Sequence, residues 1–127
     1  MQCGGKRGES ILLKASWGTE KPKIGVQEIK MYGSVHKLLP LARAEQSSKF
    51  NKDHTAARAI DGNPDTASWT KKEDPAWLRI YLKKKATVEK VVIEKGSNKA
   101  VACVLTVSVY DGEAQTVCGT YTVNPSG

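Results

Sequence analysis

The sequence predicts an all-β fold in which short, mostly antiparallel strands form a sandwich. Apolar and polar residues alternate strictly over 78–82 and over 28–31, which is the period of a half-buried strand. No segment keeps an apolar period of about 3.6 residues over about ten positions, so long amphipathic helices are not expected. Turn residues recur about every eight to twelve positions, a spacing typical of an antiparallel sandwich or barrel.

The expected strands are rich in Val, Ile and Thr or alternate in polarity, and they cover 10–17, 24–32, 77–82, 87–94, 101–110 and 117–123. Lys83-Lys84-Lys85 is expected to be a charged turn. Segment 41–48 is either a short strand or a helical turn, and 55–60 is expected to be one helical turn with Thr55 as its N-cap. The alternation predicts a core of Ile11, Leu13, Ile29, Met31, Leu78, Ile80, Leu82, Val91, Ile93, Leu105, Val107 and Val109.

The size of the chain, 127 residues and 13.8 kDa, is enough for one domain with its own core. The sequence has no run of about 18 apolar residues that could span a membrane, and no signal peptide is visible. We therefore expect a soluble domain whose export signal, if it has one, lies outside the sequence.

Twenty Lys and Arg against thirteen Asp and Glu give a net charge of +7. The lysines are dispersed and few of these residues are Arg, which favours a solvated surface first and an anionic partner second, and argues against nucleic acid.

A polar turn over 58–66 is the most distinctive segment of the chain. Asp61-Gly62 and Asn63-Pro64 are both turn dipeptides, because Gly accepts a positive φ, Pro fixes φ, and Asp and Asn bond to nearby amides. Asp61, the Asn63 carbonyl and the Thr66 hydroxyl could converge on a hard cation such as Ca²⁺, which takes about six to eight oxygen ligands. The alternative is a structural turn without a metal.

Cys3, Cys103 and Cys118 fit neither a zinc-binding pattern nor a Cys-x-x-Cys motif, and one disulfide with one remaining thiol is the simplest arrangement. Cys103 lies in an apolar run and is expected to be a buried thiol, whereas Cys3 and Cys118 stand beside glycines in loops.

The sequence lacks a Gly-x-Ser-x-Gly motif and a phosphate-binding glycine loop. Catalysis is therefore not expected.

Four separately spaced blocks resemble the opening half of a discoidin domain. This is the family of the coagulation factor five and eight C-type domains (F5/8 type C), family 32 carbohydrate-binding modules and F-type fucose lectins. The blocks are 41–48, 57–66, Trp69 and 75–82, and they occur in the family's order. Segments 8–15 and 25–33 resemble the last two strands of the same family. The resemblance implies a jelly-roll β-sandwich of the galactose-binding domain type.

The family's closing strands therefore stand at the beginning of this chain. One interpretation is a single circularly permuted domain over 1–127, in which 1–33 supplies the family's C-terminal strands and 34–127 its N-terminal and central strands. The other is the tail of one repeat followed by the head of the next, which would leave two half-sandwiches with bare sheet edges. The single domain is favoured because jelly-roll termini lie close together and such rewiring is tolerated. Residues 1–33 should then pair in the same sheets as 76–123.

The resemblance also implies site residues. The family's structural Ca²⁺ would be held by the side chains of Asp61, Thr66 and Glu28 and by the carbonyls of Arg58, Asn63 and Gln27. A Cys3–Cys118 disulfide would tie the two ends of the chain together and would indicate an oxidising, extracellular setting.

The ligand of such a domain is held by loops at one rim of the sandwich. The fucose-binding His and Arg residues of the F-type lectins are missing from the corresponding loops, 69–74 and 94–101. The donors expected there instead are His54, Lys71, Lys72, Lys95 and Lys99, which favour an acidic glycan. Phe50 beside two lysines is the one candidate for weak membrane contact.

Together these residues predict a secreted, non-catalytic, lectin-like module with a structural calcium site. Single sugars bind weakly to such sites, so several copies are expected, by oligomerisation or by repetition in a longer protein. The alternative is a cell-adhesion module that binds an acidic phospholipid, a sulfated glycan or a protein partner.

Overall fold

The computed structural model describes residues 2–16, 24–49, 51–63, 65–71, 73, 75–95 and 103–123. Along the chain the strands are β1 (Gln2–Ser16), β2 (Gly25–Tyr32), β3 (Leu41–Gln46), β4 (Ser68–Trp69), β5 (Ala76–Lys95), β6 (Cys103–Asp111) and β7 (Ala114–Val123). Two short 3-10 helices, η1 (Ser34–His36) and η2 (Ala56–Ala59), stand before and after β3. No α-helix occurs in these described ranges.

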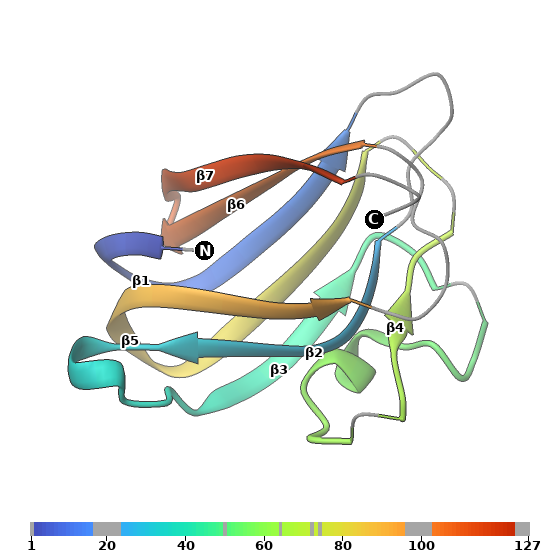
Figure 1. The fold of residues 1–127 in the computed structure, drawn as a ribbon, viewed down its shortest axis with the longest axis horizontal. Coiled ribbons are helices and arrows are strands. Elements are labelled where there is room, and N and C mark those ends of the chain that lie inside the picture. Colours follow the sequence, from blue (N-terminus) through green and yellow to red (C-terminus); the bar gives the residue numbers. More distant parts are fainter. Residues whose placement is uncertain are drawn as a thin grey trace.

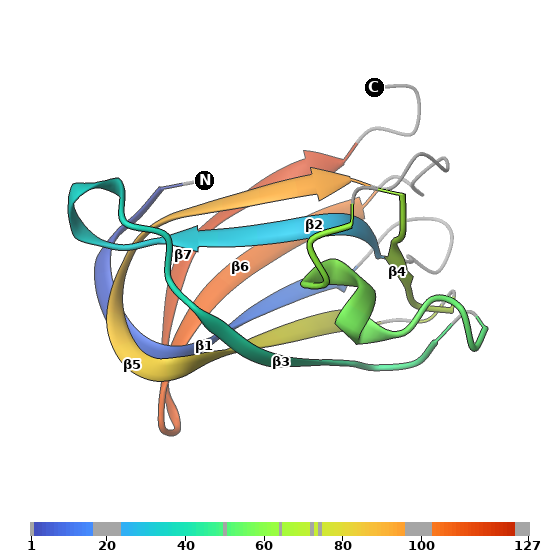
Figure 2. The same cartoon turned by 90° about the horizontal axis from the view of Figure 1, so that it is seen from below.

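A single sheet folds over on itself to make the two layers of the sandwich (Figure 1). Its strand order is β4-β2-β5-β1-β6-β7, with β3 also paired to β5. Figure 2 shows β1 and β5 curving from one layer into the other. The first half of β5 pairs with β3 and with the second half of β1, whereas the second half of β5 pairs with β2. These strand pairs are antiparallel, so the predicted fold class is confirmed.

The strands from residues 1–33 pair with strands from residues 76–123. Ile11 lies opposite both Ile80 and Val109, and Ile29 lies opposite Ile93. A single domain requires pairings of this kind. The permuted order of its strands stays a prediction.

Strand β5 continues through Lys83-Lys84-Lys85, so the turn predicted at these lysines is wrong. Main-chain pairing persists on the β3 side of the bend, where the Lys83 amide donates to the Pro40 carbonyl at 3.1 Å and Leu82 lies opposite Leu41. The lysine side chains remain exposed. The strand can therefore bend between the layers without ending.

The two uncertain segments before the central turn have distinct outcomes. Segment 41–48 contains strand β3, which decides between the two alternatives. Helix η2 provides the predicted helical turn, but Thr55 makes no side-chain capping bond, so its predicted role as N-cap is wrong. Burial of Ala56 and Ala59 against the core holds this turn instead.

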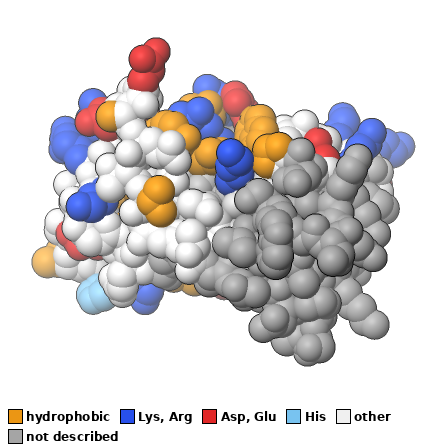
Figure 3. Space-filling view, turned by 90° about the horizontal axis from the view of Figure 1, so that it is seen from above, with side chains coloured by type: hydrophobic (Ala, Val, Ile, Leu, Met, Phe, Trp, Pro, Cys, Tyr) orange, Lys and Arg blue, Asp and Glu red, His pale blue; other side chains and the backbone are white. Residues whose placement is uncertain are grey.

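The core between the layers is made of the residues that the alternation predicts. All of them are buried except Ile93, which is partly buried against the core. Val26 and Val88 are also fully buried. On the coloured part of the face seen in Figure 3, which holds the described residues, Lys and Arg side chains are spread out and do not gather in one patch, as the sequence suggests.

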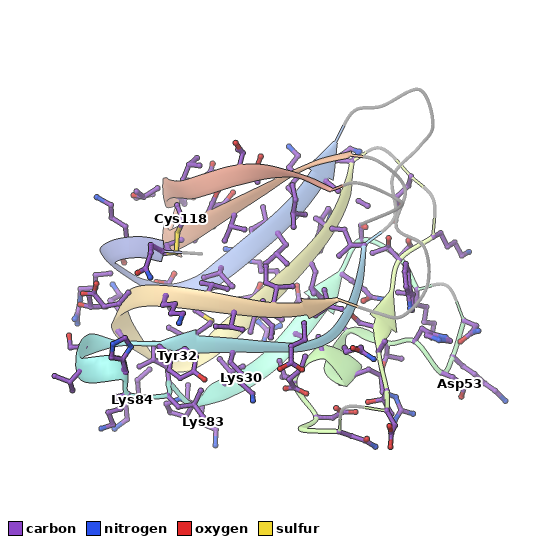
Figure 4. The ribbon with its side chains drawn as sticks, viewed as in Figure 1. Lys30, Tyr32, Asp53, Lys83, Lys84 and Cys118 are labelled. Atoms are coloured by element: carbon purple, nitrogen blue, oxygen red, sulfur yellow. A yellow bond between two sulfur atoms is a disulfide. The ribbon has the colours of Figure 1, made fainter. Side chains whose placement is uncertain are left out.

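A disulfide between Cys3 and Cys118 joins β1 to β7 (Figure 4). This confirms the pairing that the resemblance predicts. The side chain of Cys103 lies outside the described part of the structure, so its buried thiol stays a prediction. No helix in the described ranges is long and apolar enough to cross a membrane.

Candidate functional site

The oxygens of the central turn are held close together by hydrogen bonds within the turn. The Asn63 amide donates to Asp61 Oδ1 at 2.9 Å, and the Asp65 amide donates to Asn63 Oδ1 at 2.9 Å. The Thr66 hydroxyl lies 3.1 Å from the Asn63 carbonyl oxygen and also contacts Asp61 Oδ2. Gly62 has a φ of 72°, a conformation that favours glycine. Asp61, Gly62 and Asn63 therefore form the turn that their chemistry predicts.

Glu28 reaches this turn from β2. A register shift between Val26 and Glu28 marks a bulge in the strand, so Glu28 faces the turn while Ile29 packs in the core. Glu28 is 8% exposed, and its Oε1 accepts a hydrogen bond from the Gly62 amide at 3.1 Å. This contact joins the first strands of the chain to the central turn.

The carboxyl groups of Glu28 and Asp61 have pKa values that shift in opposite directions. Burial raises the pKa of Glu28, and the nearby negative charge of Asp61 raises it further, although the Gly62 amide partly opposes both. For Asp61, burial also acts to raise the pKa, but hydrogen bonds from the Thr66 hydroxyl and the Asn63 amide outweigh it and lower the pKa. Asp61 is therefore the more acidic of the two facing carboxyl groups.

The donors around the turn fit Ca²⁺ by their chemistry. Two carboxylates, a hydroxyl and carbonyl oxygens are hard ligands, which Ca²⁺ prefers. No cluster of three or more His, Cys, Asp or Glu that could hold a metal is found among the described residues. A cation at the turn would therefore take several ligands from Thr66 and from main-chain carbonyls, as the resemblance implies for Arg58, Asn63 and Gln27.

A polar hollow of about 310 Å³ lies next to the turn. Its walls come from β2, η2, β4 and the loops beside them, and they are formed by Gln27, Asp53, His54, Arg58, Asp65, Thr66, Ala67 and Trp69. Figure 4 shows Asp53 and Lys84 at opposite ends of the molecule. The hollow therefore lies at one rim of the sandwich, where binding loops are expected.

Gln46 fixes two walls of this hollow. Its side-chain amide donates to the His54 carbonyl at 3.0 Å and to the Trp69 carbonyl at 3.1 Å. The His54 ring nitrogen Nδ1 lies 2.6 Å from Asn51 Oδ1, which orients the imidazole. Trp69 is only 4% exposed, so it supports the wall and does not offer an open ring for stacking.

Arg58 connects the hollow to the turn. Its side chain lines the hollow, and its Nη1 lies 4.0 Å from Asp61 Oδ2. The two parts of the site are adjacent and share a charged side chain.

The structure describes only some of the predicted ligand-binding residues, and their role in binding stays a prediction. His54 lines the hollow, whereas Lys71 is exposed and does not line it. Lys72, Lys99 and Phe50 lie outside the described residues, and so does the side chain of Lys95.

Sequence reasoning missed Asp53, Asp65 and the side chain of Arg58 as lining residues. Asp65 and Arg58 belong to the segment singled out as the central turn, and Asp53 precedes His54 in a polar loop. Their proximity in sequence to predicted residues was a usable signal. Only the folded chain shows that they face one hollow.

Comparison with known protein families gives a match over more than half of the chain. The family model described as NedA-like, galactose-binding domain, of the F5/8 type C group, matches residues 58–127. No curated protein and no solved structure matches the chain. The matched segment contains the central turn and strands β4 to β7.

Proposed function

The chain belongs to the NedA-like, galactose-binding domain family of F5/8 type C modules, and on this premise we propose that it is a non-catalytic, lectin-like module that binds a glycan beside the central turn. The observation that carries this proposal is the polar hollow between His54, Arg58 and Asp65. The Cys3–Cys118 disulfide supports an extracellular location, because disulfides persist in oxidising compartments.

The hollow has the donors and acceptors that a sugar needs. Each sugar hydroxyl both donates and accepts, and the lining offers carboxylate acceptors at Asp53 and Asp65, a guanidinium donor at Arg58 and an imidazole at His54. A volume of about 310 Å³ is at the lower end for ligand sites, which suits one sugar ring. Binding of a single ring is weak, so several copies of the module would act together.

Substitution of the hollow tests this proposal. Arg58→Ala should weaken binding of galactose about tenfold or more, because a hydrogen bond that involves a charged group contributes about 1.5–3 kcal/mol. His54→Ala should weaken it by a smaller factor, about two- to tenfold, because an ordinary hydrogen bond contributes about 0.5–1.5 kcal/mol. Lys30→Ala is the matched control, since Lys30 is exposed on β2 and does not line the hollow. Isothermal titration with galactose and with galactose 6-sulfate measures the effect. If the hollow variants bind both sugars like the wild type, the ligand does not sit there.

We also propose that Ca²⁺ braces the turn next to this hollow. When bound, the ion would supply positive charge to the Glu28 and Asp61 carboxylates, which otherwise repel each other. Glu28 comes from β2 and Asp61 from the central turn, so a shared ion would hold the start of the chain against its middle. The ion would be structural, because its two carboxylate ligands, Glu28 and Asp61, do not line the hollow.

Ca²⁺ should raise the melting temperature of the wild type and should have no effect on Asp61→Ala or Glu28→Gln. At a hundredfold excess over its Kd, a bound ion contributes about 2.7 kcal/mol to the free energy of unfolding, which corresponds to several degrees in Tm. Glu113→Gln is the control, because Glu113 is exposed in the β6–β7 turn. Scanning calorimetry with Ca²⁺ and with chelator gives the comparison, and identical wild-type curves would refute the brace.

The raised pKa of Glu28 adds a pH dependence to this test. Because the pKa of Glu28 is raised in the folded state, folding favours the protonated carboxyl. Without the ion, the contribution of Glu28 to the free energy of unfolding is present below the ordinary pKa of 4.5 and is lost as the pH rises through the raised pKa. Ca²⁺ needs the deprotonated form. The stabilisation by Ca²⁺ should therefore grow from acidic to neutral pH.

One observation favours the adhesion alternative. Val35 and Leu38, at the η1 end of the molecule, are 93% and 55% exposed, with Lys37 between them. Val35 also has a φ of 52°, an unusual conformation for a β-branched residue. An apolar tip beside a lysine suits an acidic phospholipid surface. This tip lies at the opposite end of the long axis from the hollow (Figure 1).

A further inference from the structure

The outward face of one layer carries ordered rows of side chains that cross five strands, β3, β5, β1, β6 and β7. In one row, each residue lies directly opposite the next: Arg43, Tyr81, Ser10, Tyr110 and Gln115. The neighbouring row is Glu45, Arg79, Leu12, Ser108 and Val117. Directly opposed residues of antiparallel strands point to the same face. The core residues Ile11 and Ile80 alternate with them and point inward.

Arg79 is held in one orientation at the centre of this face. Its guanidinium carbon lies 4.5 Å from the centre of the Tyr110 ring and 5.3 Å from that of Tyr81. Its Nε donates to the Ser10 hydroxyl at 3.2 Å, and Ser10 is 0% exposed. Ser10 is small and lies between Tyr81 and Tyr110, so the guanidinium of Arg79 has room to lie across β1. Such fixing lowers the entropy that binding must otherwise remove.

No carboxylate lies within ion-pair distance of Arg79 among the described residues. The acidic residue opposite it, Glu45, bonds instead to Arg43, whose guanidinium lies 3.8 Å from the centre of the Tyr81 ring. Lys14 lies exposed in the next row, opposite Trp77. Among the described residues, these rows present the cationic groups of Arg43, Arg79 and Lys14. The carboxylates near them are those of Glu45 and, beside Trp77, of Glu73, which accepts a hydrogen bond from the Ser47 hydroxyl at 2.8 Å. The charge of the face is complementary to an anion.

We propose that this surface, the Arg79 face, is a second glycan-binding site that takes an extended acidic polysaccharide. A carboxylate or sulfate accepts two parallel hydrogen bonds from a guanidinium fork, and Arg79 is oriented to give them. Half-buried Tyr81, Tyr110 and Trp77 supply amphipathic rings along the path of the chain. A polysaccharide can cross the strands because the face belongs to a sheet and not to a closed hollow.

The composition of the face favours a polysaccharide over a protein partner. The centre of a protein interface is largely apolar and enriched in aromatic residues and Arg, so the rings and Arg79 alone would also suit a protein. The small number of exposed apolar side chains and the excess of cationic groups favour an acidic chain. On the Arg79 face, Val117 is the exposed large apolar residue among those described, and it lies on the edge strand β7. The central positions hold Arg79, half-buried Leu12, and the buried hydroxyl residues Ser10 and Ser108. The site is also separate from the hollow, which is built from β2, η2, β4 and their loops.

The test compares Arg79→Gln with Lys30→Gln, which removes the same charge from exposed β2. The probes are polygalacturonate for carboxylate, heparin for sulfate and dextran as a neutral chain, with binding measured by isothermal titration at two salt concentrations. The wild type should bind one or both acidic chains and not dextran, with an affinity that falls as salt rises. Arg79→Gln should bind at least tenfold more weakly and Lys30→Gln like the wild type. Equal losses in the two variants, or wild-type binding to neither acidic chain, would overturn the proposal.

Two further measurements distinguish binding at the Arg79 face from misfolding of the variant and from binding in the hollow. In the wild type, the Arg79 Nε–H resonance should shift on titration with the bound polysaccharide, and a resonance that stays in place while the chain binds would contradict the site. Arg58→Ala should retain polysaccharide binding, because Arg58 lies outside this face. If the hollow does not bind galactose, the proposal for the Arg79 face still stands. If the Arg79 face does not bind a polysaccharide, the proposal for the hollow still stands.

Discussion

Replacement of both Cys3 and Cys118 by serine is expected to lower the free energy of unfolding by about 2–5 kcal/mol. The two cysteines are separated by 115 residues in sequence, so the disulfide closes a loop that contains most of the chain. In the chain-entropy account, long loops gain the most from closure, because the unfolded chain loses the most freedom. The bond also ties buried Cys3, at the start of β1, to the edge strand β7. Both terminal strands should fray first in the variant.

Urea denaturation of the double variant and of the oxidised wild type measures this effect. Reduced wild type should resemble the variant, since both lack the bond. Mass mapping after non-reducing digestion checks the pairing itself. A Cys103–Cys118 link, or equal stability of the oxidised and reduced protein, would contradict the assignment.

Ile80→Ala is expected to cost about 2–5 kcal/mol of unfolding free energy. Ile80 is fully buried and lies opposite Ile11 on one side and Ala44 on the other, so it contacts the strands on both sides of β5. Truncation removes buried methyl groups and leaves a cavity that a sheet with fixed pairing fills poorly. The same strand offers a control in Lys84→Ala, because Lys84 is exposed and its loss should change stability by less than about 0.5 kcal/mol.

Urea denaturation of both β5 variants separates burial from strand propensity. A similar small loss in Ile80→Ala and Lys84→Ala would mean that the first half of β5 does not face the core. The predicted difference between the two is the direct consequence of the alternation in 78–82.

Alternation predicted the inward residues of β5 and β6 well, because the period of two depends only on the local chain and on which face is buried. It also placed Arg79 and Tyr81 on the outward face. It could not predict that Tyr110 completes the contact with Arg79, because the choice and register of partner strands are settled by distant parts of the chain. The continuation of β5 through Lys83 was missed for the same reason, since pairing with β3 decides it.

In the central turn, too, the features set by local sequence could be predicted, whereas those set by distant parts of the chain could not. Asp61, Gly62 and Asn63 carry their own turn chemistry, and the structure forms the turn with their side chains. Glu28 was assigned to the turn only through the family resemblance, and the bulge that brings it there has no signal in the sequence. The hollow is built from β2, η2, β4 and the loops beside them, which explains why Asp53 and Asp65 were not recognised as lining residues.

The most direct test of the glycan-binding proposal is a glycan array probed with the wild-type chain in Ca²⁺ and in chelator, with phosphatidylserine vesicles assayed in parallel. We predict binding to galactose-containing glycans in Ca²⁺ and weaker binding in chelator, because the ion would fix the turn whose Asp65 and Thr66 line the hollow. Arg58→Ala should bind about tenfold more weakly, because it removes the guanidinium donor from the hollow. Binding to vesicles with no signal on any glycan would contradict the proposal and would favour adhesion through Val35 and Leu38.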